Sequence, residues 1–143
     1  MELYYKNLTS FFQNILANLK CRKDTNAYII SIYAKYITAD FDLSQDNVSL
    51  LFLEARLKQD FMIYQNLGDW IFFINTTMPE HLRHASKSYY DTIARISYDS
   101  CYKIIRRQWK LFEELSDNFD PLETEVKNRL QPLIFCDTQN HIF

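Results

Sequence analysis

The chain has 143 residues, a formal net charge of −2 and 48 % hydrophobic residues, which suits one soluble globular domain that buries a core without disulfides or metals. This charge gives no reason to expect nucleic acid or an anionic membrane as the partner. A single glycine and three prolines supply few of the tight turns that β-hairpins require, so the composition favours helices joined by short polar loops.

Three widely spaced cysteines, Cys21, Cys101 and Cys136, indicate reduced thiols rather than a disulfide framework. Cys101 is expected to be a buried, small apolar side chain, and Cys21 to have little reactivity. The first residues lack the basic and apolar regions of a signal peptide, and no membrane anchor is predicted. We therefore expect a cytoplasmic protein.

The first two helices are predicted over residues 3–20 and about 26–38. In the first, apolar residues recur at three- and four-residue steps, which is the amphipathic pattern of a helix. In the second, the β-branched and tyrosine content would also suit a strand. The helical spacing and the charged flanks favour a helix, with Asp24 or Thr25 as its cap.

A loop is predicted from Thr38 to Asn47, followed by a third helix near 46–58 with Ser44 or Asp46 as its cap. Lys58 and Gln59 are expected to form a kink or a short break between this helix and the next one.

The central helix is predicted over about 60–78 and is apolar on nearly all sides, which places it in the core. Its longest unbroken apolar run, Trp70 to Ile74, is far shorter than the roughly 20 residues of a membrane span. Two interpretations remain open for the only glycine, Gly68: a left-handed helix end, or a continuous helix in which the missing Cβ lets another backbone approach. The continuous helix is favoured, and Pro79 then ends it.

The longest helix is predicted from Ser86 or Ser88 to about Phe119. It has a stripe of small side chains at three- and four-residue spacing, formed by Ala94, Ser97 and Cys101. We expect the central helix to cross the longest helix there, with Gly68 facing one of these residues and the axes closer than the usual 8–10 Å.

A last helix is predicted near 121–131, started by Asp120-Pro121 and ended by Pro132. Residues 133–143 are expected to form a loosely packed tail. The fold class is therefore all-α, a single-domain bundle of six to seven helices that spans residues 1–143.

No catalytic motif or metal site stands out, and no cofactor is predicted. His81 and His84 lie three residues apart beside Glu80, but two histidines do not complete a structural zinc site, so solvated loop histidines are favoured. Asp69 lies in an apolar setting, where a carboxyl group titrates high and could act as an acid or base. A helix cap or an ion pair to a basic residue is the favoured interpretation of Asp69.

Charge is uneven in the second half of the chain. Basic residues outnumber acidic ones over 81–110, and the reverse holds over 111–131. We expect a surface that pairs internally. The less favoured alternative is nucleic-acid binding through a basic patch, made of Arg95, Lys103, Arg106 and Arg107.

Four short motifs follow one another along the chain: Leu67-Gly68-Asp69, Pro79-Glu80, Tyr89-Tyr90 and Phe112-Glu113-Glu114-Leu115. Their order resembles a group of bacterial helical proteins of uncharacterised function. The resemblance covers about residues 45–130, although this chain has Asn75-Thr76-Thr77-Met78 where that group has a Gly- and Phe-rich turn. It implies a bacterial, helical, cytoplasmic protein and implies no activity.

The leading hypothesis for function is a non-enzymatic, helical protein-interaction module. Aromatic residues make up 16 % of the chain, more than a small core buries easily, and exposed aromatic patches mark interfaces. We expect a dimer rather than a monomer. The alternative is a small-molecule or cofactor-binding bundle, or an enzyme, with a pocket near Asp69, His81, His84, Tyr89 and Tyr90.

Overall fold

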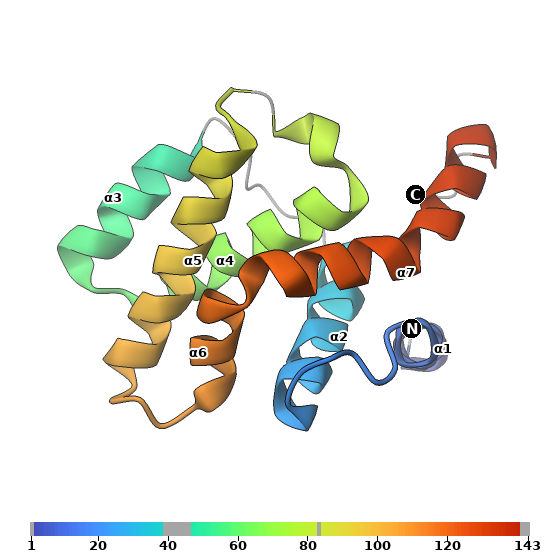
Figure 1. The fold of residues 1–143 in the computed structure, drawn as a ribbon, viewed down its shortest axis with the longest axis horizontal. Coiled ribbons are helices and arrows are strands. Elements are labelled where there is room, and N and C mark those ends of the chain that lie inside the picture. The colour runs from blue at the N-terminus through green and yellow to red at the C-terminus, as the bar shows by residue number, and fades with distance from the viewer. Residues whose placement is uncertain (1, 39–46, 83, 141–143) are drawn as a thin grey trace.

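The computed structural model describes residues 2–38, 47–82 and 84–140, and these residues form an all-α bundle without a strand (Figure 1). Its seven α-helices and one short 3-10 helix are α1 (Glu2–Ile15), α2 (Lys23–Thr38), α3 (Val48–Lys58), α4 (Phe61–Thr77), η2 (Pro79–His81), α5 (Lys87–Ile104), α6 (Lys110–Asp117) and α7 (Phe119–Asn140). The predicted fold class is confirmed.

The centre of the bundle is α4, as the sequence predicts. Every side chain of α4 from Leu67 to Thr77 is buried, and the helix packs against α2, α3, α5 and α7. The Asp60 side chain caps α4 by accepting hydrogen bonds from the backbone N–H groups of Met62 and Ile63, at 3.0 and 3.2 Å. Gln59 has a φ of 51° and ends α3, so the predicted interruption before the central helix is also found.

Gly68 lies inside a continuous helix, and the left-handed alternative is wrong because no glycine of the described chain has a positive φ. A Cβ built on Gly68 would lie 2.8 Å from the ring of Tyr98 on α5. The close approach is therefore to α5, as predicted, but the neighbour is an aromatic ring rather than the stripe of small residues. Without a Cβ at Gly68, the Tyr98 ring can lie against the backbone of α4.

The predicted long helix from Ser86 or Ser88 to Phe119 is wrong in extent. Ser86 does cap its start, since the hydroxyl oxygen accepts from the Tyr89 N–H at 3.2 Å. The helix then ends at Ile104 and the chain turns back into α6. This turn lets α6 pack on α5 and bury Phe112 and Leu115, which a straight helix would hold out in solvent.

The ends of two further helices differ from the prediction. Pro132 lies inside α7, which continues to Asn140, so Pro132 does not end it. A proline lacks its own N–H and crowds the carbonyl four residues before it, which bends a helix without requiring it to stop; Figure 1 shows α7 changing direction toward its end. The first helix ends at Ile15 instead of residue 20, because Asn18 adopts a left-handed φ of 57°.

Most of the predicted loop from Thr38 to Asn47 lies outside the described residues. Ser44 and Asp46 lie outside the described residues, and Asn47 precedes α3 without a side-chain capping bond. The side chains of the predicted tail, from residue 134 onward, are likewise outside the described part.

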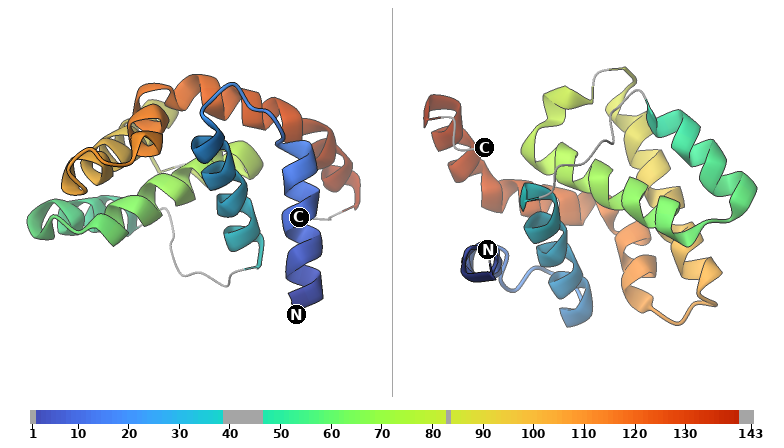
Figure 2. Two further views of the ribbon diagram at one scale, coloured as in Figure 1. Left: turned by 90° about the horizontal axis from the view of Figure 1, so that it is seen from below. Right: turned by 180° about the vertical axis from the view of Figure 1, so that it is seen from behind.

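The C-terminal end of α1 lies beside α7, as both views in Figure 2 show. The Arg129 guanidinium donates hydrogen bonds to the carbonyl oxygens of Ile15 and Ala17, at 3.1 and 2.8 Å. The Glu125 carboxylate accepts from the Lys20 backbone N–H at 2.9 Å. Since a helix leaves its last carbonyl groups without partners, α7 completes the C-terminal end of α1.

Candidate functional site

Asp69 lies at a junction of three helices, where two tyrosine hydroxyl groups donate to its carboxylate. Tyr28 on α2 lies 2.8 Å from both carboxylate oxygens, and Tyr98 on α5 lies 2.8 Å from Oδ1. The side-chain amide of Gln65 donates to the Tyr28 hydroxyl at 2.9 Å. Neither the predicted cap nor an ion pair describes Asp69, which instead accepts hydrogen bonds from tyrosine hydroxyl groups in the interior of the bundle.

Burial raises the pKa of Asp69 to about 7, against the opposing effect of the two tyrosine hydrogen bonds and of Lys35. Burial and the nearby Asp69 charge also raise the pKa of Tyr28 and that of Tyr98, so both hydroxyl groups remain protonated donors. The cluster can hold or release one proton near neutral pH. The Asp69 side chain is only 4 % exposed, so a substrate in solution could not bind to its carboxyl group directly.

The other residues of the predicted pocket do not gather around Asp69. His81, in η2, and His84 are both exposed, which agrees with solvated loop histidines. Tyr89 is also exposed, and its hydroxyl group hydrogen-bonds to Ser49 on α3, whereas Tyr90 is fully buried. Within the described residues no three His, Cys, Asp or Glu side chains are placed to hold a metal ion.

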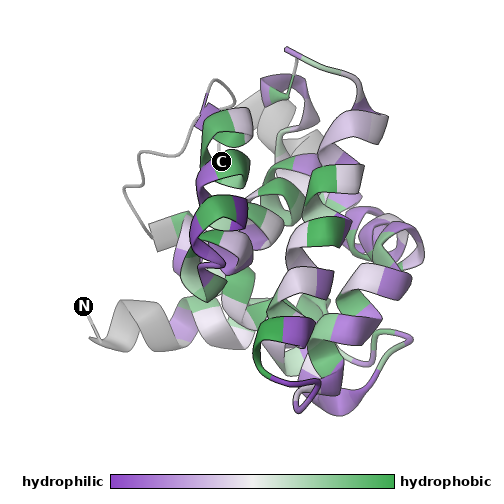
Figure 3. Ribbon diagram, turned by 90° about the vertical axis from the view of Figure 1, so that its left-hand side faces the viewer, coloured by the Kyte–Doolittle hydropathy of each residue, from purple (hydrophilic) through white to green (hydrophobic). Residues whose placement is uncertain are grey.

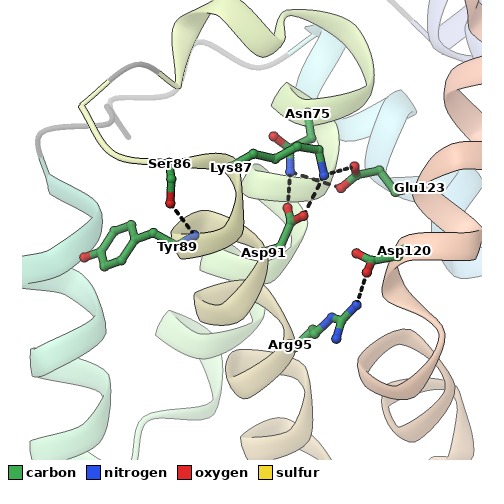
Figure 4. Close-up of polar contacts among 8 residues, drawn as sticks. All are labelled: Asn75, Ser86, Lys87, Tyr89, Asp91, Arg95, Asp120 and Glu123. Atoms are coloured by element: carbon green, nitrogen blue, oxygen red, sulfur yellow. Dashed lines mark hydrogen bonds and ion pairs between the residues drawn. The ribbon is translucent and has the colours of Figure 1, made fainter.

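A second polar cluster, which the sequence analysis missed, joins α4, α5 and α7 (Figure 4). The Lys87 ammonium group lies 2.6 Å from Asp91 and 2.7 Å from Glu123, and the Asn75 amide donates to the same two carboxylates at 2.9 and 3.0 Å. Glu123 is 4 % exposed, and its burial raises its pKa. The four-residue spacing of Lys87 and Asp91 was visible in the sequence, but their partners on α4 and α7 were not.

The uneven charge of the second half does pair internally. Two basic residues of α5, Lys87 and Arg95, form ion pairs with Glu123 and Asp120 of α7 (Figure 4). Lys103 pairs within α5, with Asp99 at 2.8 Å. Arg95 and Lys103 thus have acidic partners, which reduces the basic patch expected from the sequence to the turn after α5.

Cys21 and Cys101 show no sign of reactivity. Burial and the charges of Glu114, Glu125 and Asp24 raise the pKa of Cys21 to about 11. Burial also raises the pKa of Cys101, whose thiol packs in the core. The thiolate forms that nucleophilic chemistry requires are therefore disfavoured at both positions.

The most unusual surface is the outer face of α3, which Figure 3 shows toward the viewer. Leu50, Leu53 and Leu57 are 68 %, 53 % and 78 % exposed, and their spacing of three and four places them on one stripe. On its other side α3 buries Val48 and Ala55. This helix is therefore apolar on both sides, although only one side contacts the bundle.

Comparisons with protein-family models, curated proteins and solved structures find no match to this chain. The resemblance to bacterial helical proteins stays a prediction. None of the described helices is long and apolar enough to cross a bilayer.

Proposed function

We propose that this protein is a self-associating helical module in which the exposed leucine stripe of α3 is the contact between two copies. The observation that supports the proposal most is the position of Leu50, Leu53 and Leu57 along one exposed side of a helix. Large apolar side chains that are contiguous and exposed mark interfaces, whereas single exposed ones are common on any surface. A cytoplasmic location, indicated by the three separated cysteines, is part of the same proposal.

A second copy suits this stripe because the stripe is complementary to itself. In a two-fold contact the same patch meets its own copy, and an antiparallel pair of α3 helices would place Leu50 against Leu57 of the second copy. Leu53 would then lie next to the two-fold axis. At the margin, Glu54 and Lys58 form an ion pair at 2.8 Å, which supplies the polar rim of such an interface.

The expected association is weak to moderate. The exposed fractions of the three leucines equal about two whole side chains per copy, and burying a leucine contributes about 1.5–3 kcal/mol. Two copies would therefore gain about 6–12 kcal/mol from these residues, against an association cost of about 4–15 kcal/mol. The most favourable combination leaves about 8 kcal/mol, which corresponds to a dissociation constant of about 1 µM, so dimers should need micromolar or higher concentrations.

Sedimentation velocity from about 2 to 200 µM tests the proposal. Wild-type protein should shift from monomer to dimer across this range, and Leu53→Glu should remain monomeric because it brings two carboxylates together at the axis. Phe11→Glu is the matched control, since Phe11 is 41 % exposed on α1, on the other side of the molecule from α3 (Figure 1).

Circular dichroism melts of all three proteins show that each one is folded. A wild-type protein that stays monomeric at every concentration contradicts the proposal. If Leu53→Glu still forms dimers, or if Phe11→Glu does not, the contact between the two copies lies outside the α3 stripe.

A small-molecule-binding bundle is the second candidate, and one observation favours it: Asp69 has a pKa of about 7 beside two tyrosine hydroxyl groups. Two surface hollows, one along α7 beside Lys20 and one between the end of α1 and α2, have none of Asp69, His81, His84, Tyr89 or Tyr90 in their lining. Native mass spectrometry of freshly purified protein tests this candidate, and a mass equal to that of the chain alone in every preparation would count against it.

A further inference from the structure

The turn between α5 and α6 combines positive charge with an exposed aromatic ring. Residues 105–109 connect the helices, and the four from Arg106 to Trp109 are all exposed. Lys110 follows directly as the first residue of α6. The turn forms one end of the molecule, at the lower edge of Figure 1.

The backbone of this turn is costly for the residues that form it. Arg106 and Arg107 have φ values of 58° and 61°, the left-handed region that glycine and asparagine adopt most readily. Residues held in that region are concentrated at functional sites, because stability alone would favour another side chain. Two arginines here indicate that their charges matter at this position.

The charges of these arginines are available to a partner. Among the described residues, no acidic side chain forms an ion pair with Arg106 or Arg107. Lys110 donates to the Tyr102 hydroxyl at 2.9 Å, and its nearest carboxylate, on Glu113, is 3.9 Å away. Arg22, just before α2, also lies near Lys110, but Asp24 pairs with it at 3.0 Å, so the unpaired positive charge is that of the turn itself.

Trp109 supplies a flat surface beside these cations. Its indole ring lies nearly parallel to the buried ring of Phe112, with centroids 6.2 Å apart and planes at 19°. Phe112 supports one side of the indole, yet 54 % of Trp109 is exposed. An exposed aromatic ring held in place by a buried one, beside unpaired cations, is a surface on which a nucleobase can stack.

We propose that the α5–α6 turn binds single-stranded nucleic acid, with a base stacked on Trp109 and phosphate groups held by Arg106, Arg107 and Lys110. A single strand offers both groups that the turn would recognise: a flat base and adjacent negative charge. An anionic membrane would match the charge, but among the described residues of the turn Trp109 is the single large apolar side chain that is exposed, which leaves little apolar area to insert. This inference does not depend on the α3 interface.

Intrinsic fluorescence gives a direct assay, because the second tryptophan, Trp70, is 3 % exposed and acts as an internal reference. Titration with a single-stranded dT15 oligonucleotide at low salt should quench Trp109 emission without a blue shift. With about three phosphate contacts, the logarithm of the affinity should fall against the logarithm of salt concentration with a slope of about −2.

Two variants test the residues. Arg106→Asn with Arg107→Asn removes two charges and keeps side chains that accept a positive φ, so folding should be preserved while binding falls at least tenfold and the salt slope becomes shallower. Trp109→Ala should weaken binding about 5- to 150-fold, measured by fluorescence anisotropy of a labelled oligonucleotide. The matched control, Lys20→Asn with Lys127→Asn, removes two exposed charges from elsewhere and should change binding less than twofold.

Three results would overturn the inference. One is the absence of quenching by dT15 at low salt. Another is equal loss of binding in the control variant. The third is a blue shift with vesicles of phosphatidylserine and phosphatidylcholine without any response to dT15, which would assign the turn to a membrane surface.

Discussion

Replacing Asp69 by asparagine should change how stability depends on pH. The folded-state pKa of Asp69, about 7, lies above its ordinary value of 3.8, so the folded protein holds a proton that the unfolded chain has released between these two values. The stabilisation from this proton is fully present below about pH 4 and is lost as pH rises through 7. The difference between the two pKa values corresponds to about 4 kcal/mol.

Asparagine has nearly the same shape and never becomes charged. The free energy of unfolding of Asp69→Asn, minus that of the wild type, should therefore increase by about 4 kcal/mol between pH 4 and pH 8. Using the difference removes the contributions of all the other carboxylates, which both proteins share. Urea titrations at intervals of half a pH unit measure it, and Asp117→Asn, an exposed change on α6, should give a flat difference.

A difference for Asp69→Asn that is flat or that falls with pH would refute the reasoning, since it would mean that burial does not hold the proton. The carboxyl ¹³C shift of Asp69 gives a separate check. It should titrate near pH 7 rather than near 4.

Two further substitutions test the packing around α4. Gly68→Ala should destabilise the protein by about 1–3 kcal/mol, because the new Cβ would meet the Tyr98 ring at 2.8 Å. In a Tyr98→Leu background the same change should cost much less, and an equal cost in both backgrounds would show that the ring is not the cause. Lys87→Met should cost about 1–2 kcal/mol in urea unfolding at pH 7, because it leaves the carboxylate of Glu123 buried beside Asp91 without a cation. That loss should shrink as pH falls toward 4, because burial raises the pKa of Glu123 and so favours its uncharged form, and a loss independent of pH would point to packing alone.

Local patterns in the sequence were enough to predict the central helix and its neighbours. A stretch that is apolar on nearly all sides, too short to span a membrane and followed by Pro79, predicts a core helix. Ser86 is a residue type that commonly caps a helix. The break after Ile104 was missed because the turn uses two arginines at positive φ, where a glycine or an asparagine would have signalled it.

The candidate sites were harder to predict, because they are formed by tertiary contacts. Tyr28 and Tyr98 are 41 and 29 positions from Asp69, and nothing in the local sequence links them. The leucine stripe of α3 was visible as a set of apolar residues, but which of them face the core depends on how α3 lies against α4. Exposure, and not composition, separates Leu53 from Val48.

The bonds from α7 to α1 affect how the chain folds while it is being made. Arg129 follows Ile15 by 114 positions, so at roughly 5–20 residues per second the ribosome needs roughly 6–23 seconds to add it. Throughout that interval the end of α1 lacks its partners, and Phe12 and Leu16 lack part of the core that later covers them. The start of the chain is thus the segment that stays open longest to chaperone binding and to aggregation. Synonymous changes that slow translation before Arg129 would lengthen this exposure.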